Sequence, residues 1–199
     1  LRQLKALETL HSKKHMRLAA EEWDADWKTL IAIIMSAQTR DEVTIPAAEK
    51  LFRRYNALEK LSKSGEKSVL SIIKSVNFNR TKAKNIVACA SMLMSKYEGK
   101  IPHRIGQLIE LPGVGRKTAN VFIAEKGIEA LGVDTHVAYI SSNLNWTKNK
   151  NPDKIEIDLK KLFPRKHWAR VNPILVRFGK SHLSRKKKDV ILREILKIK

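Results

Sequence analysis

Residues 111–122 read LPGVGRKTANVF, with one proline and two glycines in the four positions 112–115, followed by an apolar helical pattern. With the short apolar segment before it, this stretch predicts a helix, a tight hairpin and a second helix over about residues 104–126. Gly113 and Gly115 permit positive φ and close approach of another backbone. Because the first amides of a helix lack partners within it, the hairpin can bind a phosphate. A plain helix–helix turn is the alternative interpretation.

The composition points to a polyanionic partner. The chain has 199 residues, 43% of them hydrophobic, which is enough to bury a core. It carries 40 Lys and Arg against 20 acidic residues, a net charge of +20. Nucleic acid is the commonest partner for so much positive charge, and the alternatives are a solubilising surface or an anionic membrane surface.

Hydrophobic periodicity predicts helices along the whole chain and no strand, so the expected fold class is all-α. The expected helices cover residues 2–20, 27–36, 42–54, 66–75, 80–97, 104–110, 116–126, 134–143, 153–162, 166–180 and 187–197. The longest apolar run, around Leu30 to Met35, is too short to span a bilayer, and we expect no membrane partner. The single cysteine, Cys89, excludes an internal disulfide and a site needing several thiolates, and we expect it to be a buried structural thiol.

Three further segments accompany the hairpin. LIAIIMSAQTRD covers residues 30–41, NFNRTKAKNI covers 77–86, and VDTHV follows the hairpin with Asp134 seventeen residues after Lys117. In this order and at these separations, the segments resemble the endonuclease III family of helix-hairpin-helix DNA glycosylases. The resemblance covers most of residues 27–137 and weakens beyond about residue 140.

The resemblance implies two helical lobes with an interdomain catalytic cleft. The central helical barrel would comprise residues 26–134, and the second lobe residues 1–25 plus 135–199. Lys117 and Asp134 would be catalytic: the neutral Lys117 amine attacks C1′ of a flipped-out nucleotide, and Asp134 stabilises charge on the sugar or moves a proton. The alternatives are a phosphate-facing surface lysine and, compatible with catalysis, a helix cap at Asp134.

The resemblance also implies a DNA-binding surface. Gln38 would enter the space left by the flipped nucleotide, and Phe78 would wedge into the duplex; the alternatives are a helix-end amide and a core phenylalanine. The hairpin would contact DNA through Pro112, Gly113, Val114, Gly115, Arg116 and Thr118. Basic residues expected to follow the phosphate backbone are Arg116, Lys82, Lys84 and Lys180. Tyr139 and His136 are candidates for the base pocket, although a histidine at such a position is more often structural.

The C-terminal region departs from the family pattern. Many members carry four cysteines there that bind a 4Fe–4S cluster, and this sequence has none, so we expect no iron–sulfur cluster, no other cofactor and no metal site. The terminal lobe would then be held by helix packing alone. The hairpin is a candidate site for a monovalent cation.

The predicted function is that of a base-excision repair enzyme, a DNA glycosylase with abasic-site lyase activity on oxidised pyrimidines. Its partner would be double-stranded DNA with a damaged base or abasic site, bound by a monomer. We expect an intracellular, DNA-associated protein, cytoplasmic in a prokaryote and nuclear or mitochondrial in a eukaryote. A glycosylase for alkylated or mismatched bases and a non-catalytic helix-hairpin-helix DNA-binding protein are the alternatives.

Overall fold

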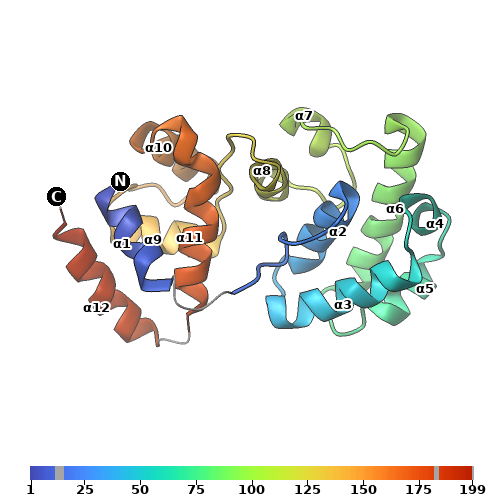
Figure 1. Ribbon diagram of the computed structural model, residues 1–199, viewed down its shortest axis with the longest axis horizontal. Coiled ribbons are helices and arrows are strands. Elements are labelled where there is room, and N and C mark those ends of the chain that lie inside the picture. Colours follow the sequence, from blue (N-terminus) through green and yellow to red (C-terminus); the bar gives the residue numbers. More distant parts are fainter. Residues whose placement is uncertain (12–15, 182–183, 199) are drawn as a thin grey trace. The chain divides into compact units, whose positions relative to one another are not determined.

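The computed structural model describes residues 1–11, 16–181 and 184–198, and within these ranges every regular element is a helix (Figure 1). The predicted all-α fold class is therefore confirmed. The helices are α1 (Arg2–His11), α2 (Asp26–Ser36), α3 (Asp41–Arg54), α4 (Leu58–Ser62), α5 (Glu66–Ile72), α6 (Asn79–Tyr97), α7 (Ile105–Leu108), α8 (Arg116–Glu125), α9 (Thr135–Asn143), α10 (Pro152–Leu162), the 3₁₀ turn η1 (Arg165–His167), α11 (Trp168–Lys180) and α12 (Arg185–Leu196). In the described ranges, no helix is both long and apolar enough to cross a bilayer.

The chain divides into two compact units, Arg17–Phe122 and Leu1–Met16 with Ile123–Lys199. The first unit is built around α2, whose residues 30–35 are all buried, so the short apolar run of the sequence is a core helix. Helices α3 and α6 pack against α2, and α4 and α5 pack against α6. Cys89 is buried in α6, and burial raises the pKa of its thiol to about 12, as expected for a structural cysteine.

The second unit joins the two ends of the chain. Helix α1 packs against α11 and α12, and the Gln3 side chain donates to the carbonyl of Ile198 at 3.1 Å. The core is lined by Leu7, Val137, Phe178 and other apolar residues of α1, α9, α10, α11 and α12. Helix α12 buries Leu192 and Ile195 in this core. Within the described residues, the C-terminal helix is thus held by side-chain packing.

Several boundaries differ from the sequence-based expectation. The first helix is described over Arg2–His11; residues 12–15 of the expected helix lie outside the described residues, and residues 16–20 are not helical. Helix α4 was not expected because five residues are too short for a periodic signal. The compact units change at Met16/Arg17 and Phe122/Ile123, whereas the functional domains were expected to change after residues 25 and 134. The division into a 26–134 barrel and a second lobe stays a prediction.

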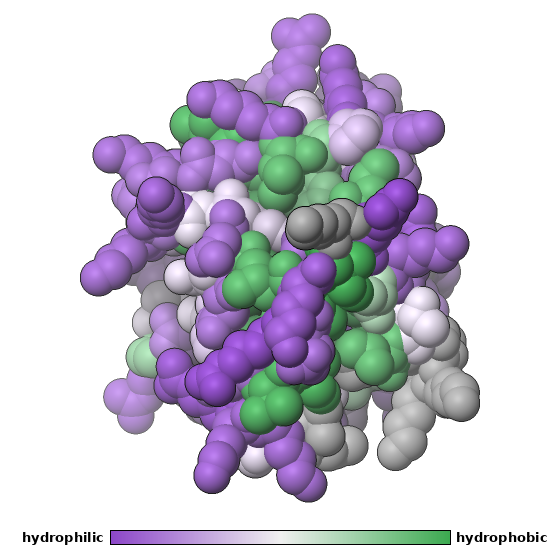
Figure 2. Space-filling model, turned by 90° about the vertical axis from the view of Figure 1, so that its left-hand side faces the viewer, coloured by the Kyte–Doolittle hydropathy of each residue, from purple (hydrophilic) through white to green (hydrophobic). Residues whose placement is uncertain are grey.

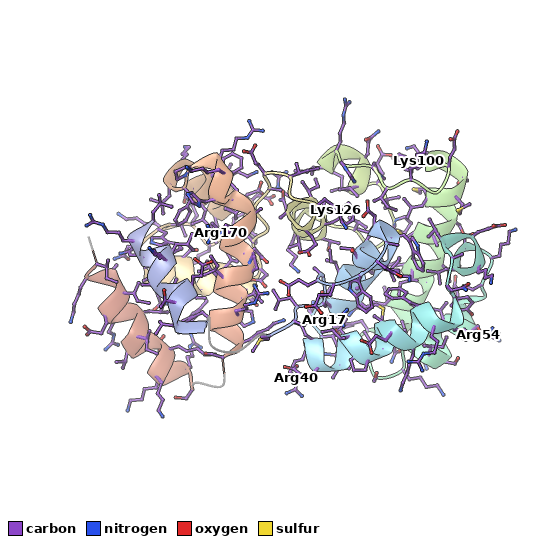
Figure 3. All side chains as sticks on the ribbon, viewed as in Figure 1. Arg17, Arg40, Arg54, Lys100, Lys126 and Arg170 are labelled. Atoms are coloured by element: carbon purple, nitrogen blue, oxygen red, sulfur yellow. The ribbon has the colours of Figure 1, made fainter. Side chains whose placement is uncertain are left out.

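The positive charge is spread over the surface. In the Arg17–Phe122 unit, the exposed Arg40, Arg54 and Lys100 lie at the start of α3, at the end of α3 and after α6, well apart from one another (Figure 3). On the face that carries α1 and α12, long hydrophilic side chains project between hydrophobic patches (Figure 2). Charge alone therefore does not locate a binding surface.

Gly179 provides a test of the packing in the second unit. A Cβ atom on Gly179 of α11 would lie 2.2 Å from His136 Nδ1 of α9. Since the imidazole must move, we expect Gly179→Ala to lower the free energy of unfolding by about 1–3 kcal/mol, measured by urea denaturation. The matched control is Gly106→Ala in α7, where a Cβ meets no atom within 4 Å and the stability should be unchanged or slightly higher. Equal losses for both variants would contradict this account.

Candidate active site and DNA-binding surface

The hairpin between α7 and α8 is a compact turn anchored by apolar side chains. Leu111 and Val114 are buried, and the Val114 amide donates to the Leu111 carbonyl at 3.0 Å. Gly113 has φ +81°, and a Cβ there would lie 3.0 Å from Asn85 Cβ of α6. Gly113 therefore uses the positive φ that glycine permits. Gly115 has no positive φ, and a Cβ added there would meet no atom of the protein within 4 Å, so the close approach of DNA at Gly115 stays a prediction.

The exposure of the hairpin residues limits how they can reach DNA. Arg116 is exposed and begins α8, whereas the side chains of Val114 and Thr118 are buried. Arg116 is therefore the exposed one of these three residues. The Gly115 carbonyl accepts from the Ala119 amide at 2.9 Å, which starts the helix at the hairpin. Contact of the hairpin with DNA stays a prediction.

The two predicted catalytic residues occupy the starts of two helices. Lys117 is the second residue of α8 and is half-buried. Asp134 is the N-cap of α9, where its Oδ1 accepts from the Val137 amide at 2.8 Å. The capping role is therefore confirmed, and it occupies one carboxylate oxygen. Lys117 belongs to the Arg17–Phe122 unit and Asp134 to the other, so their meeting at one site stays a prediction.

Gln38 and Phe78 share an unusual backbone conformation. Both are exposed, Phe78 to 63%, and both have positive φ, at 54° and 56°. The alternative of a core phenylalanine is therefore wrong. The two segments are joined, since the Asn77 side-chain amide donates to the Gln38 carbonyl at 2.6 Å and the Asn77 backbone amide donates to Thr39 Oγ1 at 3.2 Å.

Lys82 does not follow the phosphate backbone as predicted. Its side chain is only 6% exposed, and its Nζ donates to the carbonyls of Met35 and Ala37 and to Thr39 Oγ1. Burial lowers the pKa of the Lys82 ammonium to about 8, so at pH 7 it remains mostly protonated with all three hydrogens available. Sequence reasoning missed this role because the acceptors lie far away in the sequence.

The two base-pocket candidates take part in packing within their own unit. The His136 ring lies directly against Gly179. The Tyr139 hydroxyl donates to Asp189 of α12, and the Arg185 guanidinium lies 5.4 Å from the Tyr139 ring centroid. Partial burial raises the pKa of the Tyr139 phenol, and the hydrogen bond to the Asp189 carboxylate raises it further. A role in the base pocket stays a prediction for both.

Metal ligands are sparse. Among the described residues, no group of three or more His, Cys, Asp or Glu side chains lies together as a metal ion would require. The four thiolates of a 4Fe–4S cluster do not fit this sequence, because Cys89 is its single cysteine and is buried in α6.

The helical fold with its glycine hairpin corresponds to a known class of protein. Residues 31–165 match the family described as HhH-GPD superfamily base excision DNA repair protein. Endonuclease III of Thermotoga maritima is 40% identical over 156 residues, 77% of this chain and 73% of its own length. Endonuclease III of Synechocystis is 38% identical over 154 residues, 76% of this chain and 70% of its own length. The chain belongs to the endonuclease III family.

Solved structures agree with this assignment. A trapped endonuclease III–DNA covalent intermediate superposes with a TM-score of 0.82 at 28% identity, covering 92% of this chain and 87% of the other. A thermostable thymine-DNA glycosylase, at 18% identity and a TM-score of 0.77 over 94% of this chain and 89% of its own, shares the fold. The predicted endonuclease III family is therefore confirmed, within a class described as base excision DNA repair proteins.

The hairpin offers a matched pair of substitutions. Gly113→Ala places a Cβ in the left-handed region and against Asn85, so we expect a loss of about 1–2 kcal/mol in the free energy of unfolding of this unit. Gly115→Ala meets open space, and the loss should stay below about 1 kcal/mol. Chemical denaturation of both variants measures the difference, and a larger loss at Gly115 would contradict the geometry.

The capping role of Asp134 predicts a difference in stability between two substitutions at this position. Asp134→Ala removes the acceptor for the Val137 amide and should lower the free energy of unfolding by about 1 kcal/mol. Asp134→Asn keeps a side-chain oxygen there and should cost only a few tenths, roughly. Thermal denaturation of the two variants separates the contribution of the capping hydrogen bond to stability from that of the carboxylate charge. The cap account is wrong if the asparagine variant is as unstable as the alanine variant.

Proposed function

We propose that this chain removes damaged bases from double-stranded DNA with Lys117 as nucleophile and Asp134 as the acidic partner. The observation that carries the proposal is the family match over residues 31–165, which includes both residues in the expected order. The covalent DNA intermediate recorded for the endonuclease III relative supports a covalent step. Oxidised pyrimidines are the substrate class that we assign.

The proposed reaction begins with a nucleotide turned out of the duplex, because its C1′ cannot be reached within the stack. The neutral Lys117 amine attacks C1′, and the bond from C1′ to the base breaks with its electron pair leaving on the base. Opening of the sugar ring gives an iminium between Nζ and C1′. Loss of a C2′ proton then expels the 3′ phosphate, and water releases the lysine.

Asp134 has a geometry suited to this role. Its Oδ1 is fixed by the Val137 amide, which orients the carboxylate at the start of α9. We assign Oδ2 to stabilise the positive charge that develops on the sugar, or to move a proton. A fixed carboxylate needs little reorganisation when that charge appears.

The hairpin and the exposed pair Gln38 and Phe78 supply the grip on DNA in this proposal. Main-chain amides at the start of α8 and the Arg116 side chain bind phosphate, which is sequence-independent and suits an enzyme that scans DNA. Gln38 occupies the gap left by the nucleotide, and Phe78 stacks beside it. A monovalent cation at the hairpin carbonyls is part of the proposal. An iron–sulfur cluster is not, since the sequence lacks its thiolates.

The Schiff base can be tested by borohydride trapping on duplex DNA with an abasic site. Wild type should form a covalent adduct, and Lys117→Ala should form none while still binding the duplex, because only the amine can make the iminium. The matched control is Lys67→Ala, an exposed lysine of α5 that removes the same charge and should trap like wild type.

Base release from DNA containing an oxidised pyrimidine tests Asp134. Asp134→Asn, which keeps the cap, should slow single-turnover release by about 10²–10⁴.

Two outcomes of the borohydride experiment would contradict the proposal. If wild type binds DNA tightly but forms no adduct, the lyase activity is wrong, and a monofunctional glycosylase or a binding module is favoured. An adduct that persists in Lys117→Ala would reassign the nucleophile.

A further inference from the structure

Lys82 is a buried cation that the proposed chemistry does not use. It lies on α6, yet its three hydrogen bonds all go to residues 35–39, at the end of α2 and in the turn after it. The distances are 2.7 Å to the Met35 carbonyl, 2.5 Å to the Ala37 carbonyl and 3.0 Å to Thr39 Oγ1. This turn contains Gln38, whose neighbours on both sides are therefore held by the same ammonium.

The Phe78 segment is tied to the same turn. Phe78 immediately follows Asn77, whose two amide groups donate to the Gln38 carbonyl and to Thr39 Oγ1. Thr39 Oγ1 thus accepts from both Asn77 and Lys82. Lys82 lies one turn into α6 from Phe78, and its amide donates to the Phe78 carbonyl at 3.0 Å. One network therefore connects the backbones on either side of Gln38 and Phe78.

The backbone of Phe78 is strained without such support. A left-handed conformation is unfavourable for a residue with a side chain. It is common where a helix ends, as at Glu98 after α6, but Phe78 adopts it at the start of a helix, where extended backbone is usual. Strain of this kind persists only where surrounding contacts determine the conformation.

We propose that Lys82 is a positioning residue that locks Gln38 and Phe78 into one rigid element for insertion into the duplex. The inference rests on the proposed function, in which these two side chains enter DNA beside the flipped nucleotide. With three donors for three acceptors, the ammonium fixes the α2 turn against the start of α6. The two exposed side chains then keep their separation before DNA arrives, which lowers the ordering cost of insertion.

The test compares binding to two duplexes, one undamaged and one carrying a tetrahydrofuran abasic-site analogue opposite 2-aminopurine. Lys82→Met removes the hydrogen bonds at similar length, and Asn77→Ala removes the link from the other side at an exposed position. Each should lower the preference for the abasic duplex by about tenfold, the scale of one lost stacking contact. Each should also reduce the change in 2-aminopurine fluorescence, while affinity for the undamaged duplex stays within about twofold. Lys67→Ala should behave as wild type.

A combined variant separates positioning from simple destabilisation. If Lys82 acts through the inserted pair, adding Lys82→Met to a variant that already carries Gln38→Ala and Phe78→Ala should lower the preference no further. The proposal would be overturned if Lys82→Met lowered the preference for the abasic duplex by the same factor in that background as in wild type. It would also be overturned if Lys82→Met folded and kept the full preference. If Lys82→Met does not fold, Asn77→Ala carries the same comparison in the variant that lacks both inserted side chains. Should Gln38→Ala and Phe78→Ala leave the preference unchanged, insertion itself fails and this proposal with it, whereas the Lys117 trapping result stands separately.

Discussion

The backbone of Gly113 passes so close to α6 and α2 that a Cβ atom there would lie 3.0 Å from Asn85 Cβ and 3.3 Å from Ile34 Cγ2. This approach seats the hairpin on the core of the Arg17–Phe122 unit, with Leu111 and Val114 as buried anchors. Because α8 begins directly after the hairpin, the same contact determines the direction of α8 and the place of Lys117. In the function that we propose, a nucleophile on a helix whose first turn is fixed in this way can approach a sugar carbon reproducibly.

Helix ends supply most of the groups that we assign to function. Lys117 lies in the first turn of α8, Asp134 caps α9, and Gln38 and Phe78 flank the end of α2 and the start of α6. At such ends, backbone amides and carbonyls have no partner within the helix. They therefore bind either a ligand or a supporting side chain. Asp134 and Lys82 are the supporting side chains at two of these ends.

The C-terminal helix α12 is held on the second unit by apolar side chains. Leu192 and Ile195 of α12 enter the core that α1, α9 and α11 share, and Asp189 accepts from the Tyr139 hydroxyl. Apolar burial of this kind contributes a few kcal/mol for two aliphatic side chains, about 1.5–3 kcal/mol each. Side-chain packing therefore contributes directly to holding α12 on the second unit.

The sequence alone determined the fold class, most of the helices in their order, the hairpin with its two glycines, and the family. These features are local or periodic, so they can be recognised without knowing which distant residues meet. Tertiary structure decided the rest. It placed Phe78 on the surface and buried Lys82 against the Met35 carbonyl. It also left Gly115 without a close neighbour for an added Cβ. Each of these outcomes depends on which residues remote in sequence lie nearby. A lysine in a chain with 40 basic residues looks like surface charge until the carbonyls of α2 are seen around it, because hydrogen bonds across 43–47 residues leave no periodic trace.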